Sequence, residues 1–317
     1  MTRKIGLLCG REYAFPPAFI ERVNELGREH DIRAEFVTLT GTRMGEGSGY
    51  HVIVDRISHE VEYYRAFLKH ALLEGTYVIN NPFWWTADDK FFNYSVAQKL
   101  GVAVPKTVLL PQKGYPADVD LTPESLRNLG YPIDWDGLLD FVGRPAILKP
   151  YSGGGWKHVY KVHDREELIR AYDGTSPYPM TLQQFIHFDQ YVRCFTFGKT
   201  DIMPVAYDPH LRKYNVDHAY LAADLGERIV RDARTLNLAL GYEMNTIEFA
   251  VEDGVPYAID FLNPAPDFER DRITPHYFEI AVQKMAELAI DRALDGQPHQ
   301  SWPQWSAMLG MREGTPV

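Results

Sequence analysis

A lysine followed by a glycine-rich stretch is the sharpest local pattern in this sequence. Lys149 ends an apolar run, and three consecutive glycines follow shortly after it. Glycines let backbone N–H groups turn toward an anion, and a lysine at a strand end directs a fixed positive charge at it. The pattern therefore indicates a nucleotide phosphate site, with a solvated hairpin tip as the plainer alternative. The loop residues concerned are Ser152, Gly153, Gly154, Gly155 and Trp156.

A second group combines two carboxylates and an amide near the end of the chain. Glu248 and Asp260 flank a short Glu-Asp-Gly turn, and Asn263 follows closely. A hairpin can bring such side chains onto neighbouring strands, and their oxygen atoms suit Mg2+ shared with a phosphate. The alternative is an exposed acidic hairpin, because acidic residues are usually solvated. Asp267 and Glu269, just beyond, are either supporting groups or surface charge.

Composition narrows the class of protein. The 317 residues include 33 Lys plus Arg against 43 Asp plus Glu, which gives a net charge of −10. An acidic surface repels phosphate backbones and anionic lipid, so neither nucleic acid nor a membrane is an expected partner. Two cysteines, Cys9 and Cys194, are too few for a disulfide framework. Because no apolar run reaches membrane-spanning length and the N-terminus lacks signal-peptide features, we expect a folded cytoplasmic protein.

The first part of the chain alternates strand-like and helix-like segments, as in an open α/β sheet. The expected strands are residues 4–9, 33–38, 51–55 and 76–79, and the expected helices are 17–27 and 60–74.

The remaining elements position the two chemical groups. The glycine-rich stretch is expected at the tip of a hairpin, and the acidic group on two closing strands. The hairpin strands are 145–150 and 159–162, and the closing strands are 244–251 and 255–261. Further helices are predicted at 87–101, 164–172, 219–241 and 275–294, and further strands at 180–186 and 191–197. Loops are expected at 111–144, around one short helix near Thr122, and at 263–272.

Taken in chain order, these motifs resemble the ATP-grasp superfamily, which contains D-alanine–D-alanine ligase, glutathione synthetase and ribosomal-protein glutamyl ligases. The resemblance covers about residues 80 to 295. It is carried by a helix start bearing Lys90, the Lys149 strand with its glycine-rich loop, a strand entering a linker, Arg193 on a strand, and the final acid and amide hairpin. No single motif decides the assignment, but the ordered set is fairly specific.

The resemblance implies that the protein binds ATP and assigns roles to particular residues. Lys90 and Lys149 would contact the nucleotide phosphates beneath a glycine-rich lid. Arg193 would touch a phosphate or the substrate carboxylate, and Lys213 would reach over the γ-phosphate from a loop. The adenine and ribose would meet the linker and its exit, which comprise Gln183, Gln184, Phe185, Ile186 and Asp189.

The same resemblance makes Glu248, Asp260 and Asn263 ligands of Mg2+, with Mn2+ as an alternative. The sequence departs from the family here, because an acid and an asparagine are usually separated by one residue, whereas this chain reads Asp260-Phe261-Leu262-Asn263. If the register follows Asn263, Phe261 takes the usual acid position and one metal site is altered. The linker also lacks the acidic residues that commonly bind the ribose.

The fold implied is an ATP-grasp fold of α/β and α+β lobes. An N-terminal α/β lobe would span residues 1–105, a central lobe with the lid 106–186, and a C-terminal lobe with the metal hairpin and a final helix 187–317. ATP would lie between the last two lobes.

The implied activity is ATP-dependent ligation of a carboxylate to an amine through an acyl phosphate, giving an amide or peptide bond. A kinase acting on a small-molecule hydroxyl and a non-catalytic ATP-binding protein are the alternatives. The substrates would be small molecules or peptides, contacted by loops at 11–17, 207–214 and 267–272. Family members often form homodimers.

Overall fold

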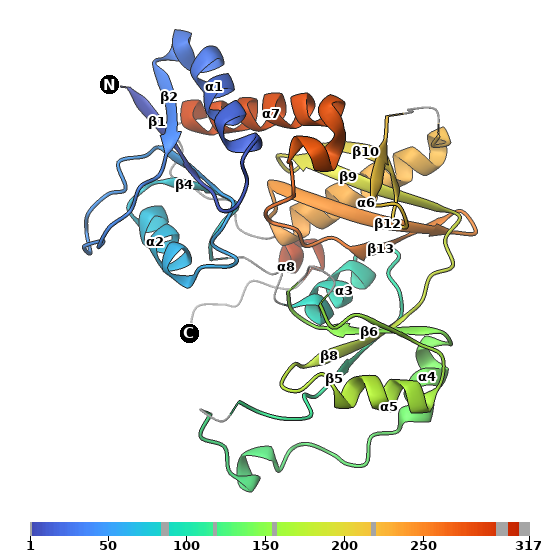
Figure 1. Ribbon diagram of the computed structural model, residues 1–317. Helices are drawn as coiled ribbons and strands as arrows, with labels where there is room; N and C mark the ends of the chain where they lie inside the picture. The colour runs from blue at the N-terminus through green and yellow to red at the C-terminus, as the bar shows by residue number, and fades with distance from the viewer. Residues whose placement is uncertain are drawn as a thin grey trace. The chain divides into compact units, whose positions relative to one another are not determined.

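The chain divides into two units, each with its own core. Unit 1 comprises Met1–Trp85, Tyr191–Phe249 and Asp260–Val317, and unit 2 comprises Thr86–Gln190 and Ala250–Ile259. Their elements are shown in the computed structural model of Figure 1. Residues 2–83, 89–116, 119–153, 157–216, 220–295 and 304–310 are described. Three predicted lid residues, Gly154, Gly155 and Trp156, lie outside them. The three-lobe boundaries at 105 and 186 stay a prediction.

Unit 1 opens with a parallel sheet whose strand order is β2-β1-β3-β4. The strands are β1 (Arg3–Leu8), β2 (Ile32–Phe36), β3 (Val52–Asp55) and β4 (Tyr77–Ile79), and the helices are α1 (Phe15–Leu26), the 3-10 turn Gly27–His30 and α2 (Glu62–Leu73). Parallel strands are covered on both faces and so read as apolar runs. All four residues of β3 are buried, as are the last four of β1. The predicted alternation of strand and helix is confirmed.

The second sheet of unit 1 is antiparallel where β9, β10 and β11 pair. Its strand order is β11-β10-β9-β12-β13, and the tip of the last hairpin belongs to unit 2. The strands are β9 (Gln190–Phe197), β10 (Asp201–Asp208), β11 (Lys213–Asn215), β12 (Met244–Glu252) and β13 (Val255–Asp260). The expected loop at 207–214 is therefore wrong in part, because β10 and β11 occupy half of it. Pro204 concealed β10, since proline argues against a strand.

Helices cover these sheets (Figure 1). Helix α6 (Ala223–Leu240) packs against β10, α7 (Arg270–Asp295) packs against α1, and a short α8 (Trp305–Met308) packs against α6. The predicted helix 275–294 is confirmed, but α7 begins earlier, at Arg270. Thr274 interrupts α7 with a φ of 73° and a ψ of 154°, and Pro275 follows it. The expected loop at 263–272 is therefore wrong at its last three residues.

Unit 2 is built on an antiparallel sheet with the order β5-β8-β6-β7. Its strands are β5 (Thr107–Leu110), β6 (Ala146–Pro150), β7 (Tyr160–Val162) and β8 (Met180–Gln184), and its helices are α3 (Lys90–Lys99), α4 (Trp135–Val142) and α5 (Arg165–Asp173), with a 3-10 turn at Pro123–Leu126. The β6–β7 hairpin on either side of the glycine-rich stretch confirms the sequence prediction. The prediction of a single short helix within 111–144 is wrong, because α4 also forms there, capped by the Asp134 side chain.

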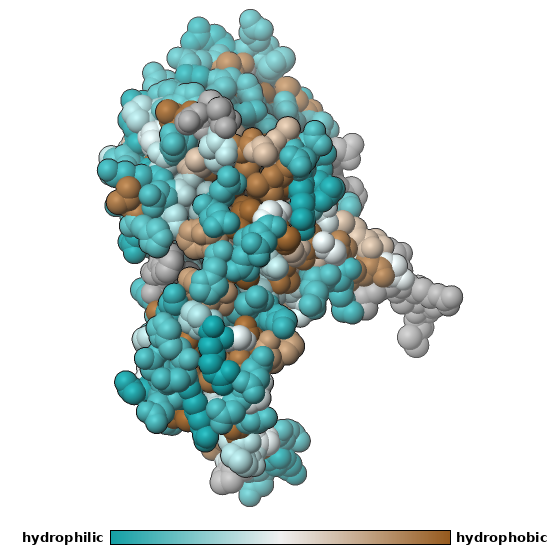
Figure 2. All heavy atoms as spheres, turned by 90° about the vertical axis from the view of Figure 1, so that its right-hand side faces the viewer, coloured by the Kyte–Doolittle hydropathy of each residue, from teal (hydrophilic) through white to brown (hydrophobic). Residues whose placement is uncertain are grey.

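One face of the molecule shows how polar and apolar side chains are distributed on it. Figure 2 shows one face, on which hydrophilic side chains predominate and hydrophobic ones gather in smaller groups between them. None of the helices that the structure describes combines the length and the apolar character needed to span a bilayer.

Candidate functional site

Two lysines meet at one corner of unit 2, where the end of β6 lies against the start of α3. The Lys149 side chain donates to the Tyr94 hydroxyl at 3.0 Å and lies near the Ile259 carbonyl at 3.4 Å. The backbone N–H of Lys90 donates to the Tyr151 carbonyl at 3.0 Å. Because Tyr94 lies one helical turn after Lys90, both residues occupy the same face of α3. The structure therefore brings together the two lysines predicted to contact phosphates.

The described start of the loop after Lys149 contains a glycine in a left-handed conformation. Gly153 has a φ of 76°, a left-handed conformation that favours glycine, and it is exposed. Ser152 is half-buried and directly follows Tyr151, whose carbonyl accepts from Lys90. Residues 152 and 153 therefore directly follow the backbone contact that joins the end of β6 to the start of α3.

The predicted linker follows β8 and contributes an aromatic surface. Gln183 is buried and donates to the Thr107 hydroxyl at 2.8 Å, while the Gln184 side chain accepts from the Lys106 N–H at 3.2 Å. Both glutamines thus hold β8 against β5. The exit consists of half-buried Phe185, buried Ile186 and exposed Asp189.

Phe185 has a cation above its ring. The Lys161 amine lies 3.8 Å from the centroid of the Phe185 ring, a favourable cation–π distance. A flat ring with a backbone strand end beside it can receive an adenine, and Asp189 at the exit remains the candidate for the ribose.

In unit 1, Arg193 belongs to a largely buried group, here called the Arg193 centre. The group comprises Arg193, the carboxylates of Glu248 and Asp260, and the tyrosines at 191, 207 and 214. One nitrogen of its guanidinium pairs with Glu248 at 2.5 Å, and another donates to the Tyr214 hydroxyl at 2.8 Å. The guanidinium stacks 3.8 Å from the centroid of the Tyr207 ring. Tyr191 donates a short hydrogen bond to the second oxygen of Glu248. The side chains of Arg193 and Glu248 are only 20% and 17% exposed, so this pairing occurs largely away from water.

Burial and neighbouring charges perturb the titration of the Arg193 centre. Burial raises the pKa of Glu248, Arg193 lowers it, and the carboxylate of Asp260 raises it again. Burial opposes the charged form of Arg193, but Glu248 outweighs it, so the pKa of the guanidinium is raised. Burial also raises the pKa of Tyr214 to about 12, against the influence of Arg193. Glu248 and Asp260 are therefore close enough to repel each other, and Arg193 supplies one compensating charge.

The predicted metal ligands can be judged on this geometry. Two mutually repelling carboxylates favour a bound cation, so Glu248 and Asp260 fit a divalent ion. Phe261 is 1% exposed and lies in the core, which leaves Asp260 as the acid beside Glu248. Asn263 is exposed, and its backbone N–H donates to the Asn245 side chain at 2.8 Å. Among the described residues no cluster of three or more His, Cys, Asp or Glu could hold a metal, and the set of two carboxylates with the Asn263 amide stays a prediction.

Lys213 does not lie on a loop as expected. It opens β11, where it pairs in register with Asp208, and its side chain is exposed on the wall of a pocket. Glu269 also differs from simple surface charge, because it is 6% exposed and its carboxylate accepts from the N–H groups of Tyr13, Ala14 and Phe15.

Comparisons with known proteins bear on this arrangement. No family model matches the chain. D-alanine–D-alanine ligase A of Bacillus cereus is 24% identical over 172 residues, which cover 49% of this chain and 57% of that relative. The match thus spans little more than half of the relative's length.

Two solved structures resemble almost the whole chain. The RimK domain ATP-grasp protein from Sphaerobacter thermophilus has a TM-score of 0.66 and 16% identity, over 91% of this chain and 98% of that one. The D-alanine–D-alanine ligase from Bacillus anthracis complexed with ATP has a TM-score of 0.63 and 17% identity, over 93% and 98%. The chain has the ATP-grasp fold. The fold class expected from its motifs is thereby confirmed, while identities this low show the fold alone.

Several residues that contact the predicted site residues escaped the sequence analysis. Tyr191 precedes Arg193 by two positions on β9, so strand periodicity places both on one face of the sheet. Tyr94 follows Lys90 by four positions on α3, the spacing of helical neighbours. Tyr214 directly follows Lys213, but nothing in its spacing predicts the bond to Arg193, which depends on how β11, β10 and β9 pair.

Proposed function

We propose that this chain is an ATP-dependent carboxylate–amine ligase that forms an amide or peptide bond through an acyl phosphate. The observation that carries the proposal is the Arg193 centre, in which a guanidinium for an anion adjoins two carboxylates for a cation. Phosphoryl transfer requires both kinds of group and little covalent chemistry from the protein. The ligase named among the relatives, from Bacillus cereus, supports the choice of ligation.

Unit 2 would hold the nucleotide. Lys149 and Lys90 would neutralise phosphate oxygens, and the N–H groups of residues 152 and 153 would bind them from the loop. The adenine would lie at the end of β8, against Phe185. The resemblance implies that unit 1 acts on the same nucleotide, and the proposal adopts this.

Unit 1 would supply the charges for the transfer. Arg193 would bind the transferred phosphoryl group or the attacking carboxylate, because a guanidinium can offer two parallel donors to either. Glu248, Asp260 and Asn263 would hold Mg2+, with Mn2+ as an alternative, and the bound ion would neutralise charge on the phosphates. Tyr191 holds the Glu248 carboxylate in place through its hydroxyl.

The reaction needs no nucleophilic side chain. An oxygen of the substrate carboxylate attacks the γ-phosphorus, the bond to the bridging oxygen breaks, and ADP leaves with that electron pair. The neutral amine then attacks the acyl carbon, phosphate leaves, and the nitrogen loses one proton to give the amide. The residues contribute by positioning and by electrostatic stabilisation, and the loop after Lys149 would exclude water from the acyl phosphate.

Trapping the acyl phosphate tests the proposal directly. The whole chain would be incubated with ATP, Mg2+ and a panel of carboxylates, and hydroxylamine would replace the amine. We expect one class of carboxylate to give both ADP and an acyl hydroxamate. Lys149→Ala and Asp260→Asn should each reduce the rate by about 100-fold, as loss of one electrostatic contact does. Lys99→Ala, which removes an exposed lysine of α3, is the matched control and should leave the rate unchanged.

The other outcomes are equally informative. ADP formation with a hydroxyl substrate and no hydroxamate would replace the ligase with a kinase. ATP binding measured by calorimetry, with no ADP from any pair of substrates, would leave a nucleotide-binding protein without turnover.

A further inference from the structure

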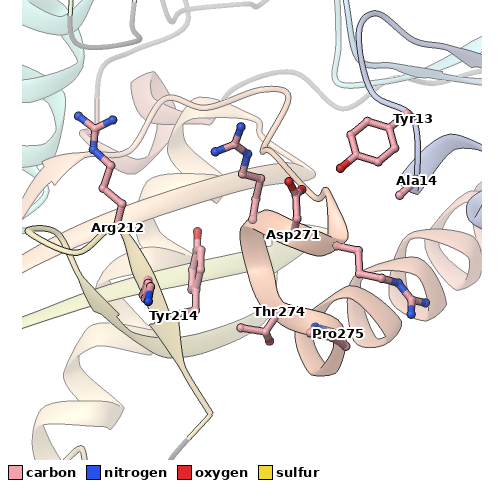
Figure 3. Close-up of a pocket in the computed structure, with 10 residues that line it drawn as sticks. Tyr13, Ala14, Arg212, Tyr214, Asp271, Thr274 and Pro275 are labelled. Carbon is pink, nitrogen blue, oxygen red and sulfur yellow. The ribbon is translucent and has the colours of Figure 1, made fainter.

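A pocket of about 570 Å³ opens on unit 1, beside the Arg193 centre. Three segments that are distant in sequence line it: the loop before α1, the turn between β10 and β11, and the start of α7 (Figure 3). These segments overlap the stretches 11–17, 207–214 and 267–272, which the sequence analysis expected to contact the substrate. All three belong to one unit, so the pocket does not depend on the placement of the other unit.

The pocket is cationic although the protein is acidic. Arg212, Lys213, Arg270 and Arg272 line it, against a single carboxylate, Asp271. Arg270 is balanced by Glu279, at 2.6 Å. The carboxylate of Asp271 and the hydroxyl of Tyr13 point toward each other in Figure 3.

Two of the cations lack a salt bridge among the described residues, although the charge of Arg272 partly offsets the burial that raises the pKa of Asp267. Within the part of the chain that the structure describes, neither Lys213 nor Arg272 forms an ion pair, and both are exposed. They come from different walls, β11 and α7 respectively. Two separated cations in a net-negative protein suit a ligand with negative groups at two places, because a single carboxylate can satisfy only one of them.

The pocket connects to the proposed chemistry through Tyr214. This residue lines the pocket, and its hydroxyl accepts from Arg193, whose guanidinium pairs with Glu248. Tyr214 is fixed by aromatic contacts with Tyr207 at 4.8 Å and Phe195 at 5.3 Å between ring centroids. One end of a ligand in the pocket can therefore lie near the Arg193 centre while the other meets Lys213 or Arg272.

Hydrogen bonds and a buried arginine hold the walls of the pocket in place. Glu269 ties the loop before α1 to the start of α7 through three backbone N–H groups. Arg56, which is 4% exposed, binds Glu12 and the Pro266 carbonyl and lies 5.0 Å from the Phe15 ring centroid. Buried charges satisfied in this way fix the spacing of the walls before a ligand arrives.

We propose that this pocket binds the carboxylate substrate, and that this substrate is a carboxylic acid bearing a second anionic group. The role of this ligand as a substrate rests on the proposed ligase activity, whereas its binding to the pocket does not require ATP. Lys213 and Arg272 recognise the second anionic group, while the reacting carboxylate lies toward Tyr214 and Arg193. Lys213 thereby acts on the carboxylate substrate rather than on the γ-phosphate.

Calorimetry on the whole chain without ATP tests the ligand class. The probes are glutarate, 3-phosphoglycerate and glutaramate, the mono-amide of glutarate, which keeps the length but loses one charge. We expect glutarate or 3-phosphoglycerate, each with two anionic groups, to bind at least about 10-fold more tightly than glutaramate, the factor typical of one charge-assisted hydrogen bond. Preference for glutarate would identify the second group as a carboxylate, and preference for 3-phosphoglycerate as a phosphate; either supports the proposal.

Variants locate the binding in the pocket. Arg272→Ala and Lys213→Ala should each weaken dianion binding about 10-fold and leave glutaramate unaffected. Arg33→Ala, an exposed arginine of β2 in the same unit, is the control and should change neither. Binding of glutarate and 3-phosphoglycerate no tighter than that of glutaramate, no binding of either in the millimolar range, or an equal loss in Arg33→Ala would overturn the proposal.

ADP formation separates this proposal from the ligase activity on which it rests. If a dianion binds through Arg272 but no carboxylate elicits ADP, the pocket's ligand class stands and the ligase activity fails. If monocarboxylates elicit ADP as well as dianions do, the activity stands and the ligand class fails.

Discussion

The Arg193 centre and the cationic pocket lie side by side in unit 1, but they differ in whether their cations form ion pairs. In the centre, Arg193 is paired with Glu248, Tyr191 binds the same carboxylate, and both ionic side chains are largely buried. In the pocket, Lys213 and Arg272 are exposed and the described residues supply no ion pair for either. Arg193 thus has its partner carboxylate within the folded chain, whereas on our proposal the two pocket cations receive theirs from a ligand. We expect loss of the Arg193–Glu248 pair to lower stability strongly and substitutions of the two pocket cations to act mainly on ligand affinity.

The largest effect should come from breaking the Arg193–Glu248 pair. Arg193→Met leaves Glu248 buried beside Asp260 without its cation, and breaking a largely buried pair costs about 3 kcal/mol of unfolding free energy. Chemical denaturation of the variant would measure this loss. The double variant Arg193→Met with Glu248→Gln removes the stranded charge and should recover most of it. If the single variant unfolds like the wild type, the centre contributes no more to stability than a surface pair.

The next largest effect concerns Glu269, which joins two walls of the pocket. Glu269→Ala removes the acceptor from the N–H groups of Tyr13, Ala14 and Phe15, so we expect a loss of about 2 kcal/mol in the free energy of unfolding. Weaker glutarate binding should accompany it, since the loop before α1 loses its anchor.

Glu269→Gln is the matched comparison, because its amide oxygen still accepts. It should retain more stability than Glu269→Ala. Full retention of both stability and glutarate binding in Glu269→Ala would show that the walls are held by other contacts, such as those of Arg56.

Some elements of the fold could be predicted from neighbouring residues in the sequence, and others could not. The β6–β7 hairpin, the closing strands and the position of Lys149 follow from apolar runs and turn residues that lie next to one another. Helix α4 was missed because its helical signal is short and includes Gly137, although the Asp134 cap was readable. Strand β10 was missed because Pro204 argues against a strand.

The site shows the same division. Periodicity could have placed Tyr191 with Arg193, since both lie on β9. The bonds from Tyr13, Ala14 and Phe15 to Glu269 bring together residues about two hundred and fifty positions apart, as the separation of 254 between Phe15 and Glu269 shows. No local pattern reports such a contact, because it depends on the packing of α1 against α7.

A smaller effect is expected at Thr274, on the pocket wall. Its φ of 73° is costly for a β-branched residue, about 1 to 3 kcal/mol, while Pro275 accounts for the extended ψ. Thr274→Gly relieves this strain and adds some entropy to the unfolded chain, so the net gain should be about 1 kcal/mol. Thermal unfolding would measure it. Thr274→Ala keeps the strain and should show no gain, and a glycine variant no more stable than the alanine variant would mean that the strain is absent.

The smallest effect on the protein alone is expected from Arg272→Ala. An exposed side chain with no ion pair among the described residues should change the free energy of unfolding by less than about 0.5 kcal/mol. The variant and the wild type should differ in the free energy of unfolding only when glutarate is present. At a glutarate concentration of about 100 times its dissociation constant, binding should stabilise the wild type by about 2.7 kcal/mol. The same concentration should stabilise a variant with about 10-fold weaker binding by only about 1.4 kcal/mol. Denaturation with and without glutarate, and with glutaramate as the control ligand, measures both quantities. Equal stabilisation of the two proteins would mean that Arg272 does not meet the ligand, whereas a large loss without any ligand would mean that the pocket, like the Arg193 centre, is held together by its own charges.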